Sequence, residues 1–127
     1  MLSSDYPYES REQACKATSE SSFYAKTDTD RSYLLGLSSN DYLKGMVLGG
    51  VPTVAVASTE SAFRYYKSGV VTTGCRSDGE GLDHAVAVVG YGVETDPETA
   101  EEHPFFLIKN SWGSDWGDLG GYIKLSS

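Results

Sequence analysis

Short apolar blocks separated by polar, glycine-rich segments run along most of the chain, and each block predicts one structural element. In the segment 37–50, apolar side chains recur on one face at helical spacing, at Tyr42, Leu43, Met46 and Val47. Ser38 or Ser39 can cap the start of this helix, and Gly49 and Gly50 end it. We expect the helix to pack on a sheet.

The later apolar blocks have the length and composition of β-strands. They cover residues 52–58, 70–74, 84–92, 104–112 and 120–127, with one turn of helix within 61–69. The valine-rich run 84–92 is almost wholly apolar, which predicts a strand buried on both faces. The run 93–103 carries five acidic residues and predicts a solvated surface loop.

One helix followed by an antiparallel run of strands predicts an α+β domain built on an antiparallel sheet or a partly closed barrel. A length of 127 residues suits one domain of ordinary size. We expect this domain to span residues 33–127. Residues 1–32 are polar and rich in turns, which predicts an irregular lead-in.

The charge of the chain narrows the classes of partner. A net charge of −8 leaves no basic patch to neutralise phosphates, so we expect no nucleic-acid partner and no membrane partner. No run approaches the roughly 18 apolar residues that a membrane span needs. The start, MLSSDYPYES, lacks the basic and apolar regions of a signal peptide. No Cys-x-x-Cys pair is present, and we expect neither a metal nor a cofactor.

Imidazole chemistry is limited to two histidines, His84 and His103. His103 ends the acidic run and is expected to be a surface residue. His84 stands between a glycine-rich loop and an apolar strand, where a rigid scaffold can hold the ring and leave one nitrogen open. The alternative is that His84 only closes the strand by hydrogen bonding to the backbone.

Asn110 follows the apolar stretch FFLIK and also stands at the end of a predicted strand. Its carbonyl oxygen, pointed at an imidazole N–H, would fix the tautomer and the tilt of the ring. Trp112 can cover such a pair and keep water out, or it can be an ordinary core residue. By spacing alone, Cys15 and Cys75 are compatible with one disulfide, two free thiols or bonds to cysteines elsewhere.

Two long motifs carry a resemblance to a known family. LDHAVAVVGYG (82–92) and FFLIKNSWGSDWGDLGGYIKL (105–125) resemble the histidine and asparagine motifs of papain-like cysteine proteases, the cathepsin family. Shorter matches occur in the family's order: YPY followed by a cysteine, YAKTD, GGVPTVAV, and YYKSGV before a cysteine. The resemblance therefore runs over nearly all of the chain.

The resemblance implies roles for individual residues. His84 would be the catalytic imidazole, Asn110 the residue that orients it, and Trp112 the shield over their hydrogen bond. Trp116 is similar to the family's second tryptophan, on the leaving-group side. The pocket that reads the side chain two positions before the cut would be formed by Val56, Leu82 and Ala85. The implied reaction is cysteine acyl transfer on a peptide or protein substrate.

The family's nucleophile signature, Cys-Gly-Ser/Ala-Cys followed by an aromatic residue, does not occur in this sequence. Cys15 and Cys75 each resemble a family disulfide position, which implies partners outside the chain. Cys75 as an alternative nucleophile lacks the helix N-terminus that lowers a thiol pKa. We therefore expect an incomplete fold whose partner is the helical, nucleophile-bearing domain of the same protease. The isolated chain is expected to be inactive.

Other interpretations predict different behaviour. A catalytically silent binding or structural domain would carry the same motifs and is the alternative function. A zinc site at Cys75, Asp83, His84 and His103 would lack the close ligand spacing of such sites. We expect the face that meets the other domain to be apolar and to promote self-association. The resemblance also implies a lysosomal, vacuolar or secreted location, where disulfides persist.

Overall fold

The computed structural model describes residues 4, 6–16, 39–76, 78–117 and 119–127. The chain divides into two compact units, Met1–Gly36 and Leu37–Ser127. The motif YAKTD and Ser38, one of the two predicted helix caps, lie outside the described residues. The predicted boundary between residues 32 and 33 stays a prediction.

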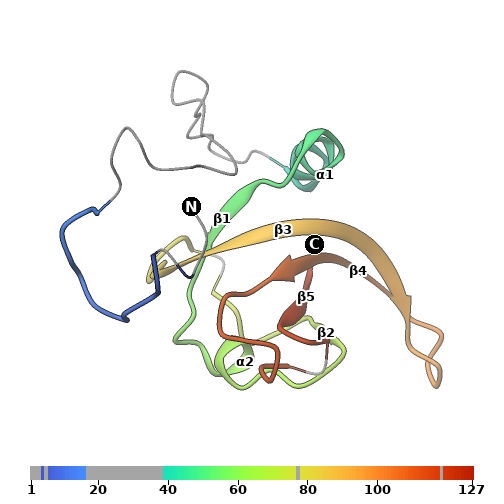
Figure 1. The fold of residues 1–127 in the computed structure, drawn as a ribbon. Helices are drawn as coiled ribbons and strands as arrows, with labels where there is room; N and C mark the ends of the chain where they lie inside the picture. The colour runs from blue at the N-terminus through green and yellow to red at the C-terminus, as the bar shows by residue number, and fades with distance from the viewer. Residues whose placement is uncertain (1–3, 5, 17–38, 77, 118) are drawn as a thin grey trace. The chain divides into compact units, whose positions relative to one another are not determined.

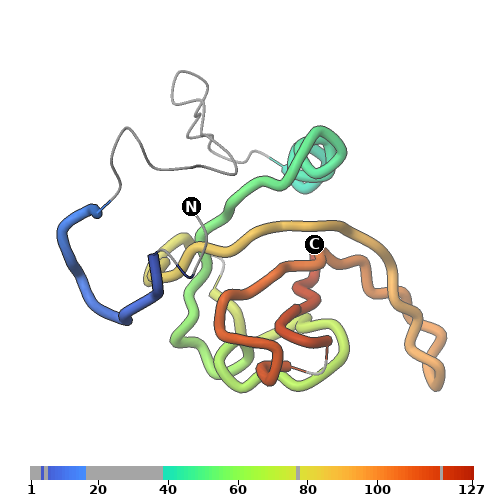
Figure 2. The backbone as a smooth tube through the Cα atoms, in the orientation of Figure 1, coloured from blue at the N-terminus to red at the C-terminus, as the bar shows by residue number. Residues whose placement is uncertain are grey.

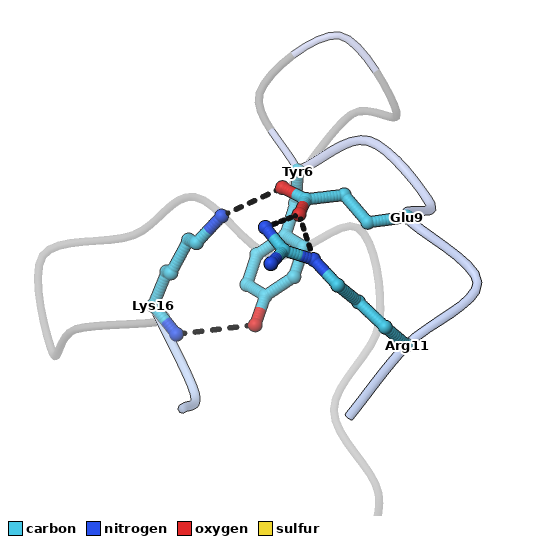
Figure 3. Close-up of polar contacts among 4 residues, drawn as sticks. All are labelled: Tyr6, Glu9, Arg11 and Lys16. Atoms are coloured by element: carbon cyan, nitrogen blue, oxygen red, sulfur yellow. Dashed lines mark hydrogen bonds and ion pairs between the residues drawn. The ribbon is translucent and has the colours of Figure 1, made fainter. Parts of the chain in front are cut away.

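In the first unit, polar side chains gather around the Glu9 carboxylate (Figure 3). The carboxylate accepts hydrogen bonds from Arg11 Nε at 2.9 Å and from Lys16 Nζ at 3.0 Å. These two cations hold the pKa of Glu9 below its ordinary value. The Tyr6 hydroxyl accepts the backbone N–H of Lys16 at 3.1 Å. The described residues of this unit form a turn, bends and irregular backbone, without a helix or strand.

The second unit begins with the predicted helix, α1, which spans Asn40–Gly49. The Ser39 hydroxyl caps it by accepting the backbone N–H of Tyr42 at 3.3 Å. Leu43 is buried, and Val47 packs against the same core, while Tyr42 is 44% exposed and turns away from it. The helix contacts strand β3, so the predicted packing on a sheet is observed with a narrower apolar face.

A sheet of five strands follows, in the order β1-β3-β4-β5-β2 (Figure 1). The strands span Thr53–Val56 (β1), Val70–Val71 (β2), His84–Thr95 (β3), Glu102–Lys109 (β4) and Tyr122–Ser126 (β5), and the single-turn helix α2 spans Ser61–Arg64. All pairings are antiparallel except that of β2 with β5, which is parallel. The predicted antiparallel run is observed for β1, β3, β4 and β5, and the parallel pairing of β2 with β5 departs from it. A strand of two residues carries no directional signal in the sequence.

Strand β3 differs from its prediction in burial and in length. Val86 and Val88 are buried, but Ala85 is exposed, and so are Tyr91 and Val93 further along. The prediction of burial on both faces is therefore wrong, because valine and alanine on the open face hide the alternation in an apolar run. The acidic loop was predicted to span residues 93–103. Strand β3 continues to Thr95 and β4 begins at Glu102, so the connection between them covers only residues 96–101 (Figure 2).

The core lies on one face of the sheet. Val86 and Val88 of β3, Ile108 of β4 and Ile123 of β5 are buried there. Phe63 of α2 is 1% exposed and is the largest of the fully buried side chains. Through Phe63, this single turn of helix packs on the sheet at the end where β3 begins.

Replacing Phe63 with alanine is expected to lower the free energy of unfolding by about 3–5 kcal/mol, because it deletes a fully buried aromatic ring. Tyr65→Ala is the matched control, since Tyr65 lies two residues away and is 71% exposed. That change should stay within about 0.5 kcal/mol. Denaturant unfolding followed by circular dichroism measures both variants. Equal losses in the two would contradict the assignment of Phe63 to the core.

Candidate active site

His84 and Asn110 meet at the end of the sheet although 26 residues separate them. His84 is the first residue of β3, and its backbone is paired with Val56 of β1. Asn110 comes directly after β4, whose last residue, Lys109, pairs with Ala87 of β3. The β3–β4 pairing therefore brings the two side chains together. His84 Nε2 lies 2.8 Å from Asn110 Oδ1.

The orientation of the Asn110 amide fixes the tautomer of the histidine. Asn110 is only 7% exposed, and its Oδ1 also accepts the backbone N–H of Ser111 at 2.8 Å. Because an amide oxygen can only accept, the His84 Nε2 must carry the proton in this hydrogen bond. The lone pair of the neutral ring is then on Nδ1. Asn110 Nδ2 has no partner among the described residues.

Aromatic rings enclose the imidazole. The Trp112 ring stacks on His84 with centroids 5.1 Å apart and planes 25° from parallel. Phe63 makes edge contacts with His84 and with Trp112, at centroid distances of 6.3 and 5.5 Å. Trp116 packs at 5.5 Å from Trp112 and 5.3 Å from Phe63. Trp112 is itself 41% exposed, so it covers one face of the imidazole as a lid toward solvent.

The loop that carries both tryptophans is closed on itself by Gly121. The Gly121 carbonyl accepts the backbone N–H of Asn110 at 2.9 Å, and its N–H donates to the Trp116 carbonyl at 3.0 Å. Gly121 has a φ of +96°, and a Cβ placed there would lie 2.9 Å from the Gly113 carbonyl oxygen. A residue with a side chain therefore cannot hold the loop in this conformation.

Asp83 is a residue of the site that the sequence reasoning considered only as a zinc ligand. Its carboxylate accepts the backbone N–H of Ser58 at 2.7 Å, and its own N–H donates to the Val56 carbonyl at 3.1 Å. The bond from Ser58 is the largest cause that lowers the pKa of Asp83, and the neighbouring His84 lowers it further. Asp83 thus ties the start of β3 to the end of β1. Its place directly before His84 was the signal in the sequence.

Of the three residues predicted to form the substrate pocket, two line the same cavity and one does not. Val56 and Leu82 line one cavity of about 120 Å³, which Phe63 also borders. Ala85 lies on the exposed side of β3 and is not among the lining residues. The roles of these residues stay predictions.

The two cysteines are free thiols on the surface. Desolvation by its surroundings, followed by the negative charge of Glu60, raises the pKa of the Cys75 thiol. A raised pKa leaves less thiolate, which opposes a nucleophilic role for Cys75. The pairing of both cysteines with partners outside the chain stays a prediction.

Two further features bear on the alternatives. His84 and Asp83 of the zinc hypothesis are engaged with Asn110 and Ser58, and His103 pairs in the ladder with Glu94, far along β3. Over the described ranges, no group of three or more His, Cys, Asp or Glu side chains could hold a metal ion. In the same ranges, no helix has the length and apolar character to cross a bilayer.

Comparison with known proteins places these features in a family. The family described as "Papain family cysteine protease" matches residues 1–127. The chain is 41% identical to "Thiol protease aleurain" of Arabidopsis thaliana over 122 residues, covering 94% of this chain and 31% of the relative. It is 35% identical to "Procathepsin L" of Felis catus, covering 95% and 34%. The crystal structure of the Carica candamarcensis cysteine protease CMS1MS2 in complex with E-64 superimposes with a TM-score of 0.74 at 31% identity, covering 98% and 51%.

This chain belongs to the papain family of cysteine proteases. The predicted resemblance is confirmed, and so is the predicted fold class, the α+β sheet or partly closed barrel of the papain-like β domain, with a sheet that is mixed at one edge. The chain spans about a third of the length of the curated relatives it matches.

At a pH where His84 is neutral, we expect its proton on Nε2, because the Asn110 carbonyl oxygen accepts from that nitrogen. Imidazole nitrogen chemical shifts in ¹⁵N NMR distinguish the two tautomers. Asn110→Ala should remove the preference at His84, and His103 serves as the internal control in the same spectrum. A ring protonated on Nδ1 in the unaltered chain would contradict this geometry.

Gly121→Ala is expected to destabilise the fold by at least about 1 kcal/mol more than Gly120→Ala. Both glycines have a positive φ, but a Cβ at Gly120 meets nothing within 4 Å, whereas one at Gly121 meets backbone. The neighbouring variant therefore isolates the steric clash from the backbone penalty. Thermal unfolding compares the two. Equal destabilisation would mean that the loop is not closed at Gly121.

Proposed function

We propose that this chain supplies the histidine and asparagine of a papain-like cysteine endopeptidase, and that the cysteine nucleophile comes from a domain outside these 127 residues. The hydrogen bond between His84 Nε2 and Asn110 Oδ1 carries the proposal. It leaves Nδ1 as the nitrogen able to exchange a proton with a thiol. The absence of the family's nucleophile signature from the sequence supports the second half of the proposal.

In the proposed reaction, His84 Nδ1 takes the proton of the cysteine thiol and becomes part of an imidazolium. The thiolate attacks the peptide carbonyl carbon, and the C–N bond breaks as Nδ1 returns the proton to the leaving nitrogen. Water then hydrolyses the thioester, with Nδ1 as the base, and regenerates the thiol. Asn110 holds the ring in one orientation and keeps the proton on Nε2 throughout, because its carbonyl oxygen can accept from Nε2 in both charge states.

The surrounding residues support this chemistry by excluding water and binding substrate. Trp112 stacks on the imidazole and would protect its bond to Asn110. Trp116 packs against Trp112 and would lie on the leaving-group side, a role that the family resemblance alone implies. The cavity lined by Val56 and Leu82 offers an apolar surface for a substrate side chain. Ala85 belongs to the same proposed pocket by the family resemblance alone.

Family membership also supports proposals about the parent protein. Its substrates would be peptides or proteins, and its location lysosomal, vacuolar or secreted. Cys15 and Cys75 would form disulfides with cysteines outside the chain, since both thiols are exposed. The face that meets the nucleophile-bearing domain would promote self-association when that domain is absent.

The isolated chain is expected to show no turnover of fluorogenic peptides, because covalent catalysis requires the nucleophile. The assay compares the purified chain with its His84→Ala variant. Turnover by the unaltered chain that disappears in His84→Ala would overturn the proposal, because the chain would then hold a complete active site.

Inactivity alone would also fit a catalytically silent domain, so a chimera separates the two. The nucleophile-bearing part of a papain-family relative, such as the Arabidopsis aleurain, is fused in front of residues 37–127. We expect turnover that falls at least about 10²-fold in His84→Ala, since a general acid–base group contributes that much. His103→Ala is the matched control and should leave turnover unchanged. A folded chimera without activity would favour the silent domain.

A further inference from the structure

A hollow of about 420 Å³ lies beside Trp112, the tryptophan whose ring stacks on His84. It is lined by Ser58, Thr59, Arg64, Tyr65 and Trp112. The hollow and the His84 imidazole therefore have this one ring as a common neighbour. Its volume is in the range of pockets that bind small ligands, and it is large enough for an amino-acid side chain.

Arg64 gives this lining its positive charge, and its backbone is held in place. The Arg64 N–H donates to the Glu60 carbonyl at 2.8 Å, and the Arg64 carbonyl accepts the Trp116 indole N–H at 3.3 Å. The side chain is exposed, and it forms no ion pair with any other residue that the structure describes. A fixed backbone with an unpaired guanidinium is suited to bind an incoming anion.

Two acidic residues, Asp83 and Glu60, belong to the segments around the hollow. The carboxylate of Asp83 accepts the backbone N–H of Ser58. The charge of Glu60 acts on Cys75 and Arg76. Neither acidic residue is among those that line the hollow. The lining therefore has a positive charge, although the chain as a whole has a net charge of −8.

We infer that Arg64 determines specificity: it selects substrates with a carboxylate on the leaving-group side of the cleaved bond. The inference rests on the proposed function, in which His84 protonates the leaving nitrogen. A group that protonates this nitrogen must be within hydrogen-bond reach of it. Because Trp112 both covers the imidazole and lines the hollow, the proposal assigns the segment after the cut to the hollow. There the guanidinium can bind a carboxylate through two parallel hydrogen bonds.

The carboxylate has two chemical sources, an acidic side chain or a free C-terminus, and three peptides distinguish them. The probes are Ala-Glu-Ala-amide, Ala-Gln-Ala-amide and Ala-Gln-Ala with a free carboxylate. They are titrated into the ¹⁵N-labelled 127-residue chain at low ionic strength, and the indole N–H resonances of Trp112 and Trp116 report binding. We expect at least one acidic probe to bind about fivefold more tightly than the neutral amide, as an exposed ion pair allows.

Arg64→Gln should abolish that preference while retaining the weaker binding of the neutral peptide. Lys67→Gln is the matched control, because Lys67 is an exposed cation three residues away that does not line the hollow. Equal affinity for all three peptides, a preference that survives Arg64→Gln, or no binding of any peptide would overturn the inference. The titration involves no cleavage, so its failure is distinct from loss of turnover in the chimera that tests the proposed function.

Discussion

The antiparallel pairing of β3 with β4 is the constraint on which the site depends. Side chains alternate between the two faces of a strand, so His84 shares the face of Val86 and Val88, and Asn110, two residues after Ile108, shares the face of that residue. A slip of one residue between the strands would send one partner to the opposite face. The register is shifted only beyond this region, between Val88 and Gly90. The half of the hairpin that holds the site therefore keeps a regular ladder.

Core packing and site geometry are built from the same side chains. Phe63 is buried against the sheet and also contacts the rings of His84, Trp112 and Trp116. The Asn110 side-chain oxygen accepts from the Ser111 N–H and lies 2.8 Å from His84 Nε2, and the Asn110 backbone N–H donates to the Gly121 carbonyl, while Nδ2 has no partner among the described residues. The core thus contains a buried polar residue, Asn110, whose side chain fixes the tautomer of the His84 ring. Because so many contacts share this task, the imidazole is fixed before any substrate binds.

The main helix and most of the strands were predicted from local patterns of apolar residues. The His84–Asn110 pair was predicted from two long motifs. Sequence reasoning failed where the outcome depended on contacts between distant segments. Two residues at Val70–Val71 cannot reveal that they join the last strand in parallel. The apolar run of β3 hid its alternation, since exposed alanine and valine look like core residues in a sequence. The structural role of Asp83 was not predicted, because its carboxylate accepts the backbone N–H of Ser58. Every residue except proline has such an N–H, so the identity of Ser58 does not indicate the contact.

Every described contact that orients His84 comes from residues 56–121, within the unit Leu37–Ser127. The pairing of His84 with Asn110 therefore does not depend on the thiol that the proposed reaction requires. This independence of the His84–Asn110 pair limits how a thiol can reach the imidazole. With Nε2 bonded to the Asn110 oxygen, only Nδ1 is available to a thiol, so the proposed reaction requires the thiol to meet the ring at that edge. In the proposed reaction, the nitrogen that exchanges the proton is thus selected by an amide oxygen directly after β4, within this chain.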